Sequence, residues 1–401
     1  MASCQVGGSI ARRRQAGETS PTMRAGVQQF PTMRPAHLFF LLTLIAALSP
    51  AQKRLVLIDQ DGAGPGGSDQ MAMLALLQTP QVEVLGITIV TGDAWRDEET
   101  LHTLRMLELT GHSSVPVAKG AVFPLVRTQL ETRLATAIDG NVAWLGAWGG
   151  ASSTMVETAA GVTPVISEKR QAHTPYEIPP MPEGMPSLKP IDEDAAHFLI
   201  RQVRAHPHQV TIYAAGPLTN IALAISIDPE FASLTQGIVL MGSSLNPQTD
   251  DQEFTASPRH EFNFWFDPEA AHIVLRANWP RVDVTTVDVS IKAPFTQRML
   301  DEISKSQNPT ARYIAAWSQN RYYLWDELEA CAWLDPTIIT KEKLVYMDVD
   351  LSHGPTYGDT LTWSEQFKPA TGVRQVHAQL DLDLPRFEKM FVELMTGASG
   401  K

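Results

Sequence analysis

Three aspartates are grouped in the segment LIDQDGAGPGGSDQMAML, residues 57–74. Asp59 and Asp61 follow a short apolar run, and Asp69 follows a glycine-rich turn at the start of a helix-like stretch. Carboxylates so close together are best explained by a hard cation, and Ca²⁺ takes six to eight oxygen ligands. The structural alternative is that Ser68 or Asp69 caps the helix and the glycines only form the turn.

The same glycine-rich turn is a poor candidate for a phosphate-binding loop. No lysine follows it as in a Walker loop, and the glycine spacing is not GxGxxG. The neighbouring carboxylates would also repel a phosphate. A Rossmann-type nucleotide binder that needs no calcium therefore stays open only as a lesser alternative.

Strand-like and helix-like segments alternate along the chain around this turn. Such repeated alternation predicts a mostly parallel sheet, because parallel strands need long crossovers that usually contain a helix. We expect one α/β domain over residues 53–401, a single open sheet with helices on both faces, in which residues 135–190 form long loops. Strands are expected at 54–59, 82–90, 115–117, 210–214, 237–241 and 281–287, and helices at 68–78, 98–111, 192–205, 218–227 and 268–277. Asp61 then lies at the carboxyl end of a strand, where such sheets bind ligands.

The N-terminal region carries an apolar run of 12 residues at 37–48. A run of this length is too short to cross a bilayer core of roughly 30 Å, and it is typical of a signal peptide. Small residues follow it up to Ala51. We therefore expect residues 1–52 to be a signal peptide with an upstream segment, and the mature protein to be secreted or periplasmic without a stable membrane anchor. A buried first helix is the alternative.

Charge and cysteine content limit the partners. The chain has 32 Lys and Arg against 44 Asp and Glu, a net charge of -12, and no basic stripe with interleaved aromatic residues. Such a surface repels a phosphate backbone, so nucleic-acid polymers are excluded as expected partners. Only Cys4 and Cys331 are present, and loss of the signal segment would leave one thiol and no intramolecular disulfide.

Three further segments carry polar residues at strand ends and helix starts: AAGPLTNIALA at 214–224, EFNFWFDPEAA at 261–271 and YYLWD at 322–326. Taken singly, each is explained by a turn, a helix cap or core packing. Taken in order with residues 57–93, they resemble the inosine/uridine-preferring nucleoside hydrolase family over roughly residues 54–395. The resemblance implies hydrolysis of the N-glycosidic bond of a ribonucleoside to free base and ribose.

The resemblance also implies roles for individual residues. It implies a Ca²⁺ ion held by the side chains of Asp61, Asp69 and Asp326 and by the main-chain carbonyl of Ala215. Asp61 would also act as general base toward the attacking water. Glu261 and Asn263 would hydrogen-bond the ribose hydroxyls. Members of the family are commonly dimers or tetramers, which implies a homo-oligomer.

This sequence departs from the family pattern where the sugar and base would bind. Ser68 stands where the family has a ribose-binding aspartate, Thr255 where it commonly has an asparagine, and Asp93 where asparagine is frequent. Trp325 replaces a histidine that in some members assists the departing base, so stacking or another proton donor would take over that role. A secreted, non-catalytic protein that binds calcium or sugar on the same fold is the alternative function.

Overall fold

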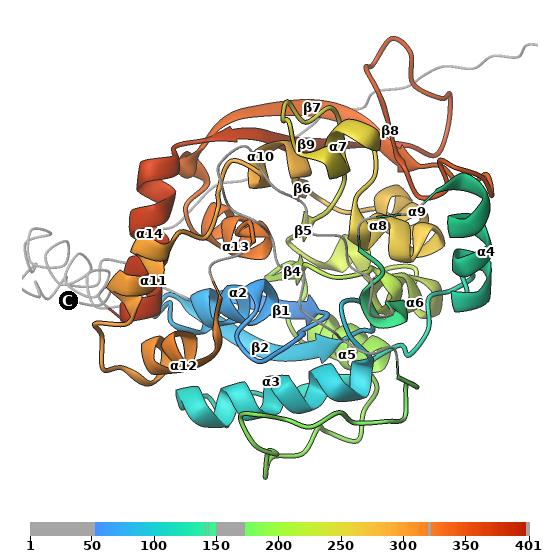
Figure 1. Ribbon diagram of the computed structural model, residues 1–401. Helices are drawn as coiled ribbons and strands as arrows, with labels where there is room; N and C mark the ends of the chain where they lie inside the picture. The colour runs from blue at the N-terminus through green and yellow to red at the C-terminus, as the bar shows by residue number, and fades with distance from the viewer. Residues whose placement is uncertain (1–52, 141, 143, 150–172, 320–321, 398–401) are drawn as a thin grey trace, which may run out of the picture. The chain divides into compact units, whose positions relative to one another are not determined.

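The computed structural model describes residues 53–140, 142, 144–149, 173–319 and 322–397 (Figure 1). The signal peptide expected at residues 1–52 lies outside these ranges, so its cleavage and the export of the protein stay predictions. Among the described residues, no helix has the length and apolar character needed to cross a membrane. Cys331 is a buried free thiol.

The centre of the fold is a nine-stranded sheet with the strand order β3-β2-β1-β4-β5-β6-β9-β7-β8. Strands β1 to β6 run parallel to their neighbours, and β9 is parallel to β6, while β7 is antiparallel to both β8 and β9. The strands are β1 Arg54–Gln60, β2 Val82–Ile89, β3 Val117–Lys119, β4 Val210–Ala214, β5 Gly237–Met241, β6 Val282–Thr285, β7 Ile339–Val349, β8 Thr360–Trp363 and β9 Arg374–Leu382. The open, mostly parallel sheet predicted from the sequence is confirmed, and the antiparallel edge is an addition that the sequence pattern did not indicate.

Helices cover both faces of this sheet, as predicted (Figure 1). Val56 and Ile58 of β1 pack on one face with α2, α3 and α11 to α14, while Leu57 packs on the other face with α5, α6 and α9. This alternation follows from the two-residue period of a strand that is buried on both sides. The helices are α2 Ser68–Leu77, α3 Arg96–Thr110, α4 Gln129–Asp139, α5 Ala195–Ala205, α6 Thr219–Ile227, α7 Gln252–Ala256, α8 Phe262–Phe266, α9 Pro268–Arg276, α10 Val287–Ser290, α11 Gln297–Ile303, α12 Pro309–Trp317, α13 Trp325–Leu334 and α14 Leu384–Thr396, with short 3-10 turns η1 Gly146–Trp148, η2 Ala232–Leu234 and η3 Pro336–Ile338.

The strand order reverses direction at β1. From β1 the chain adds β2 and β3 on one side, and later β4, β5 and β6 on the other side. Loops that leave neighbouring strands at such a switch point diverge, which opens a crevice at the carboxyl ends of the strands. The glycine-rich turn after β1 therefore lies at the place in the sheet where a ligand site is expected.

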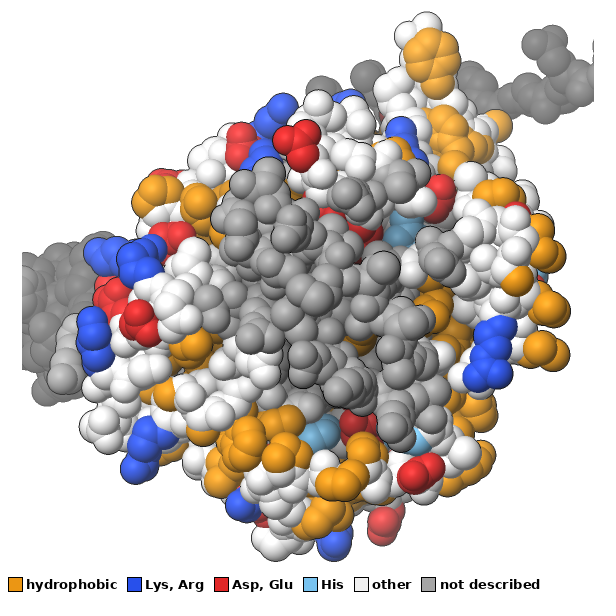
Figure 2. All heavy atoms as spheres, in the orientation of Figure 1, with side chains coloured by type: hydrophobic (Ala, Val, Ile, Leu, Met, Phe, Trp, Pro, Cys, Tyr) orange, Lys and Arg blue, Asp and Glu red, His pale blue; other side chains and the backbone are white. Residues whose placement is uncertain are grey.

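Helix α4 ends at Asp139 and so extends into the stretch predicted as loop from residue 135, and it differs from the other helices in what it exposes. Leu130, Leu134 and Ile138 recur every four residues on one side of α4, and their exposed fractions are 68%, 55% and 80%. Figure 2 shows hydrophobic side chains gathered on the right-hand edge of the molecule, where Figure 1 places α4. A run of exposed apolar residues on one helix face is uncommon on monomeric proteins.

Candidate active site

Asp61 follows β1 directly, and its side chain is held between two glycines. A Cβ atom on Gly92 would lie 2.0 Å from Asp61 Oδ2, and one on Gly216 would lie 2.7 Å from Asp61 Oδ1. The backbone N–H of Asp93 donates to Oδ2 at 2.9 Å. The loops after β2 and β4 thus close on a carboxylate that is buried, and only residues without a side chain fit at these two positions.

Two helix starts bring the other predicted carboxylates to the same place. Asp69 lies in the first turn of α2 and Asp326 in the first turn of α13, and both are buried. The two helices pack against each other. Gln60 Nε2 donates to Asp326 Oδ2 at 2.7 Å, which ties α13 to the end of β1. A helix N-terminus carries a partial positive charge, so both positions favour an ionised carboxylate.

Asp59, the third aspartate of the segment, points away from this group. Its Oδ1 accepts hydrogen bonds from the Thr88 hydroxyl and, at 2.8 Å, from Asn220 Nδ2. The backbone N–H of Ala215 donates to the Asp59 carbonyl at 3.1 Å, which joins the end of β4 to β1. Asp59 therefore links the end of β1 to β2, to α6 and to the end of β4. Ala215 itself lies on the wall of the neighbouring cavity.

That cavity has a volume of about 710 Å³ and is strongly acidic. Its described wall contains seven carboxylates and no lysine, arginine or histidine: Asp61, Asp69, Asp93, Asp251, Glu253, Glu261 and Asp326. Burial, together with the nearby negative charges of Asp93 and Asp69, raises the pKa of Asp61 well above its usual range. Burial likewise raises the pKa of Asp326, and Glu327 adds to the effect.

Buried carboxylates without a basic partner are costly unless protons or a cation balance their charge. The possible ligands from Asp61, Asp69, Asp326 and the Ala215 carbonyl are all oxygen atoms, which is the donor set of a hard divalent cation. Glycines at the two positions that touch Asp61 keep its carboxylate in one place. The residues at the end of β1 therefore fit a metal ion such as Ca²⁺.

A second group of polar residues begins at helix α8. Glu261 caps this helix: its carboxylate accepts from the backbone N–H groups of Asn263 at 2.8 Å, Phe264 at 3.0 Å and Ser243 at 3.1 Å. Asn263 Nδ2 donates to the Met241 carbonyl at 3.1 Å. Glu261 and Asn263 are buried and line the cavity. Glu261 Oε1 accepts only the Asn263 N–H and keeps a further lone pair, and the amide oxygen of Asn263 is also an acceptor, so both side chains can accept from a sugar hydroxyl.

The remaining wall is aromatic. The Trp325 ring lies edge to face with Phe254 of α7 at a centroid distance of 6.0 Å and with Tyr323 at 5.1 Å. Other aromatic residues of the wall are Trp144, Phe262, Trp317 and Tyr322. A cavity lined by both aromatic rings and carboxylates suits a ligand that has a planar ring and hydroxyl groups.

Known proteins share both the sequence and the fold. The model of the family described as inosine-uridine preferring nucleoside hydrolase matches residues 56–389. "Probable uridine nucleosidase 1" of Oryza sativa subsp. japonica is 28% identical over 358 residues, which are 85% of this chain and 96% of that protein. "Pyrimidine-specific ribonucleoside hydrolase RihA" of Citrobacter koseri is 29% identical over 260 residues, which are 65% of this chain and 68% of that protein.

The chain belongs to the inosine-uridine preferring nucleoside hydrolase family. It is a ribonucleoside hydrolase, an enzyme that hydrolyses an N-glycosidic bond. Among solved structures, a plant nucleoside hydrolase and a purine-preferring ribonucleoside hydrolase from Gardnerella vaginalis each superpose with a TM-score of 0.64 at 23% identity. The likeness covers 86% of this chain and 99% and 98% of those chains. It shows that this nucleoside hydrolase has their fold.

Two of the residues at which this nucleoside hydrolase departs from the family pattern, Ser68 and Asp93, line the cavity. Ser68 lines the cavity and donates from Oγ to Glu327 Oε2 at 2.6 Å, so it orients a carboxylate. Asp93 also lines the cavity and accepts at Oδ1 from the Trp144 indole N–H. Both side chains therefore lie on the wall of the cavity in which the sugar is expected to bind.

Thr255 does not reach the cavity, contrary to its predicted contact with the substrate. It is exposed, and its Oγ1 donates to the Asp251 carbonyl at 3.0 Å. The reason is the single helical turn of α7, which Asp251 caps by accepting from the Glu253 backbone N–H. This turn brings Glu253 and Phe254 to the cavity wall and leaves Thr255 on its outer side.

Several residues of the site were not singled out from the sequence. Gln60 bonds Asp326, and Glu327 bonds Ser68. Each is next in sequence to a predicted site residue, and this position is the one feature of the sequence that could have indicated them. Trp144, Tyr323 and Glu253 come from loops or from a five-residue helix, where no periodic pattern shows which side chain faces inward. Trp144 and Tyr323 complete the aromatic side of the cavity wall, and Glu253 adds a carboxylate to the wall.

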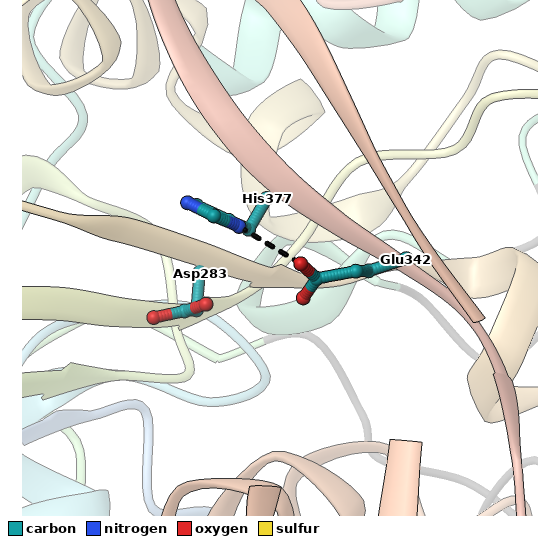
Figure 3. A group of neighbouring side chains, drawn as sticks. All are labelled: Asp283, Glu342 and His377. Atoms are coloured by element: carbon teal, nitrogen blue, oxygen red, sulfur yellow. Dashed lines mark hydrogen bonds and ion pairs between the residues drawn. The ribbon is translucent and has the colours of Figure 1, made fainter. Parts of the chain in front are cut away.

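A separate group of acidic and histidine side chains lies on the outer strands, where Asp283, Glu342 and His377 come from β6, β7 and β9 (Figure 3). One ligand atom of each lies within 4.8 Å of the others. His377 Nδ1 lies 3.2 Å from Glu342 Oε1. Both oxygens of Asp283 accept from the Arg281 guanidinium, at 2.6 and 2.7 Å. A cation from the chain itself thus balances this cluster, and none of its members lines the cavity.

Proposed function

We propose that this ribonucleoside hydrolase depends on Ca²⁺, held by Asp61, Asp69, Asp326 and the Ala215 carbonyl. The observation that carries the proposal is the set of buried carboxylates at the end of β1 in a cavity whose described wall has no basic side chain. A divalent cation at this position would offset their charge and supply Lewis acidity that makes a water molecule a better nucleophile.

The residues of the chain would carry out proton transfer, sugar binding and stacking on the base. Asp61, held between Gly92 and Gly216, accepts the proton of the water that attacks the anomeric carbon. Glu261 and Asn263 hold the ribose hydroxyls, and their backbone partners keep them in place as the sugar develops oxocarbenium character. Trp325 stacks against the base. The reaction yields the free base and ribose.

Uridine is the substrate that we propose to test first. The support is that the rice relative is named a uridine nucleosidase and the Citrobacter koseri relative a pyrimidine-specific hydrolase. Inosine belongs in the same panel because the family is described by both nucleosides.

The deciding experiment measures reducing sugar released from uridine, cytidine, inosine and adenosine, with Ca²⁺ and with a chelator. We expect release that the chelator abolishes and added Ca²⁺ restores, and a loss of at least about 10³-fold in the Asp61→Asn variant because the base is removed. Asp301→Asn, a substitution of an exposed aspartate on α11, serves as the matched control and should behave as wild type. Calcium binding without release from any nucleoside would favour a non-catalytic binding protein.

We also propose that the enzyme self-associates and is exported. The exposed stripe of Leu130, Leu134 and Ile138 on α4 supports self-association, because such a stripe is self-complementary when two copies meet about a two-fold axis. Light scattering should show an oligomer that Leu134→Glu dissociates, and an unchanged mass would contradict this surface. For export, residues 1–52 fused to alkaline phosphatase should place the reporter outside the cytoplasm.

A further inference from the structure

The departing base needs a proton, and Trp325 cannot supply it. An indole N–H is a hydrogen-bond donor but not an acid at neutral pH. The described wall of the cavity contains no histidine or lysine, so its candidate acids are the carboxyl groups and the tyrosines. Burial raises the pKa of Tyr322 well above its usual range, which makes that phenol a still weaker acid.

Most of the carboxyl groups of the wall already have another task. Asp61, Asp69 and Asp326 belong to the proposed cation site, and Glu261 is fixed by three backbone N–H groups on the sugar side. Three carboxylates remain, namely Asp93, Asp251 and Glu253. Asp93 is bonded to Trp144, and Asp251 caps α7 and accepts from the Tyr323 hydroxyl at 3.3 Å. Glu253 is the one whose carboxyl is not held by a hydrogen bond from another described residue.

We propose that Glu253 is the general acid that protonates the departing base. The proposal rests on the proposed function, because it assumes that the base leaves toward the aromatic wall. Helix α7 adjoins that wall directly: Phe254 meets the Trp325 ring, and Asp251 meets Tyr323, which itself packs on Trp325. Glu253 lies between these two residues in the sequence of α7 and lines the same cavity.

The surroundings of Glu253 suit an acid that works at neutral pH. Burial, with the negative charges of Asp251 and Glu261, raises its pKa to about 7. A group with this pKa holds its proton in part of the molecules at pH 7 and still releases it readily, which is the optimum for general acid catalysis. The raised pKa follows first from burial and then from the two neighbouring carboxylates.

The proposed step balances as follows. The bond between the anomeric carbon and the base nitrogen breaks, and its electron pair goes to the base. The Glu253 carboxyl proton passes to the base, and Glu253 becomes a carboxylate. Water oxygen bonds to the anomeric carbon, and Asp61 takes the proton that this water loses. Exchange with solvent then returns a proton to Glu253 and removes one from Asp61, so that one water is consumed for each base released.

The test compares substrates whose leaving groups differ in their need for a proton. The Glu253→Gln variant keeps the shape of the side chain and removes the acid. We expect kcat for uridine and inosine to fall by about 10²-fold or more, which is the usual contribution of a general acid. For 4-nitrophenyl β-D-ribofuranoside, whose nitrophenolate leaves without a proton, kcat should change by less than about threefold. Glu83→Gln, an exposed glutamate on β2, is the matched control and should match wild type on both substrates.

The pH profile gives an independent measure. In the wild-type enzyme, kcat for uridine should fall as the pH rises above about 7, because Glu253 then loses its proton. The Glu253→Gln variant should lack this fall. A fall that persists in the variant would overturn the assignment.

The failures can be told apart. If wild type releases sugar from no nucleoside and from no nitrophenyl riboside, the proposed function fails. If wild type is active and Glu253→Gln loses both substrates equally, or neither, Glu253 is not the acid. A selective loss of nucleoside hydrolysis in Tyr323→Phe, with Glu253→Gln unaffected, would assign the proton to that phenol and overturn the proposal.

Discussion

The carboxylates at the end of β1 and those on the outer strands differ in what balances their charge. Asp283 on β6 is paired through both oxygens with Arg281, and the cluster that it forms with Glu342 and His377 is partly exposed. Asp61 and Asp326 are buried, and the described wall of their cavity offers no basic side chain. The comparison shows that closeness of acidic residues alone does not indicate a cation site. Burial without a basic side chain on the described wall is what supports the cation proposed at Asp61 and Asp326.

The largest effect is expected where neighbouring glycines leave room for the buried Asp61 carboxylate. Gly92→Ala would place a Cβ atom 2.0 Å from Asp61 Oδ2, so the carboxylate must move. A displacement of about 1 Å at a reacting group costs on the order of 10²-fold in rate, and we expect kcat/KM for uridine to fall at least that much. Gly354→Ala is the control, because a Cβ there has only Ser352 O within 4 Å, at 3.9 Å. Equal activity in both variants would show that Asp61 need not be fixed.

The next prediction concerns the pH dependence of stability. The folded-state pKa values of Asp61 and Asp326 are raised above the ordinary carboxyl range. The folded chain therefore holds these protons more tightly than the unfolded chain, and their stabilisation is lost as the pH rises from that range through neutrality. In chelator the Tm should fall over this interval.

Calcium should replace the lost protons, so its stabilising effect should grow with pH. At a concentration 100 times Kd, a cation adds about 2.7 kcal/mol, which corresponds to roughly 4 °C in Tm for a chain of this size. We expect this gain at pH 8 and a much smaller one at pH 5. Asp326→Asn should reduce the gain at pH 8, and a gain independent of both pH and this substitution would place the cation elsewhere.

The two sides of the cavity also differ in how far the sequence could predict them. Asp61 and Asp69 lie in one turn from strand to helix, so local pattern placed them together, and the parallel sheet followed from the alternation of elements. Helix α7 is only five residues long. It contacts the rest of the site through Tyr323, whose hydrogen bond to Asp251 joins residues 72 positions apart, and through Trp325, which packs on Phe254. Such packing has no local signal, which is why Thr255 was expected inside and lies outside.

A smaller effect is expected from the aromatic side. Trp325→Ala removes the ring that Phe254 and Tyr323 hold in place. Aromatic pairs contribute about 0.5–1.5 kcal/mol beyond their buried area, so we expect kcat for inosine to fall by roughly 3- to 10-fold. Calcium affinity, measured by titration calorimetry, should stay the same. An unchanged kcat would remove Trp325 from the mechanism.

The smallest effect is expected on the outer strands. The Glu342 side chain is 49% exposed, and its partner His377 lies 3.2 Å away. Exposed pairs of this kind contribute about 0–1 kcal/mol, so Glu342→Gln should change Tm by no more than about 1 °C. It should also leave the dependence of activity on Ca²⁺ unchanged, because Arg281 already balances Asp283. If Glu342→Gln instead reduced the stabilisation by Ca²⁺ or Zn²⁺ as much as Asp326→Asn does, a metal ion would have to displace the Arg281 guanidinium. Pairing with Arg281 would then no longer distinguish the outer cluster from the carboxylates of the cavity. Burial would be the one remaining difference between the two groups.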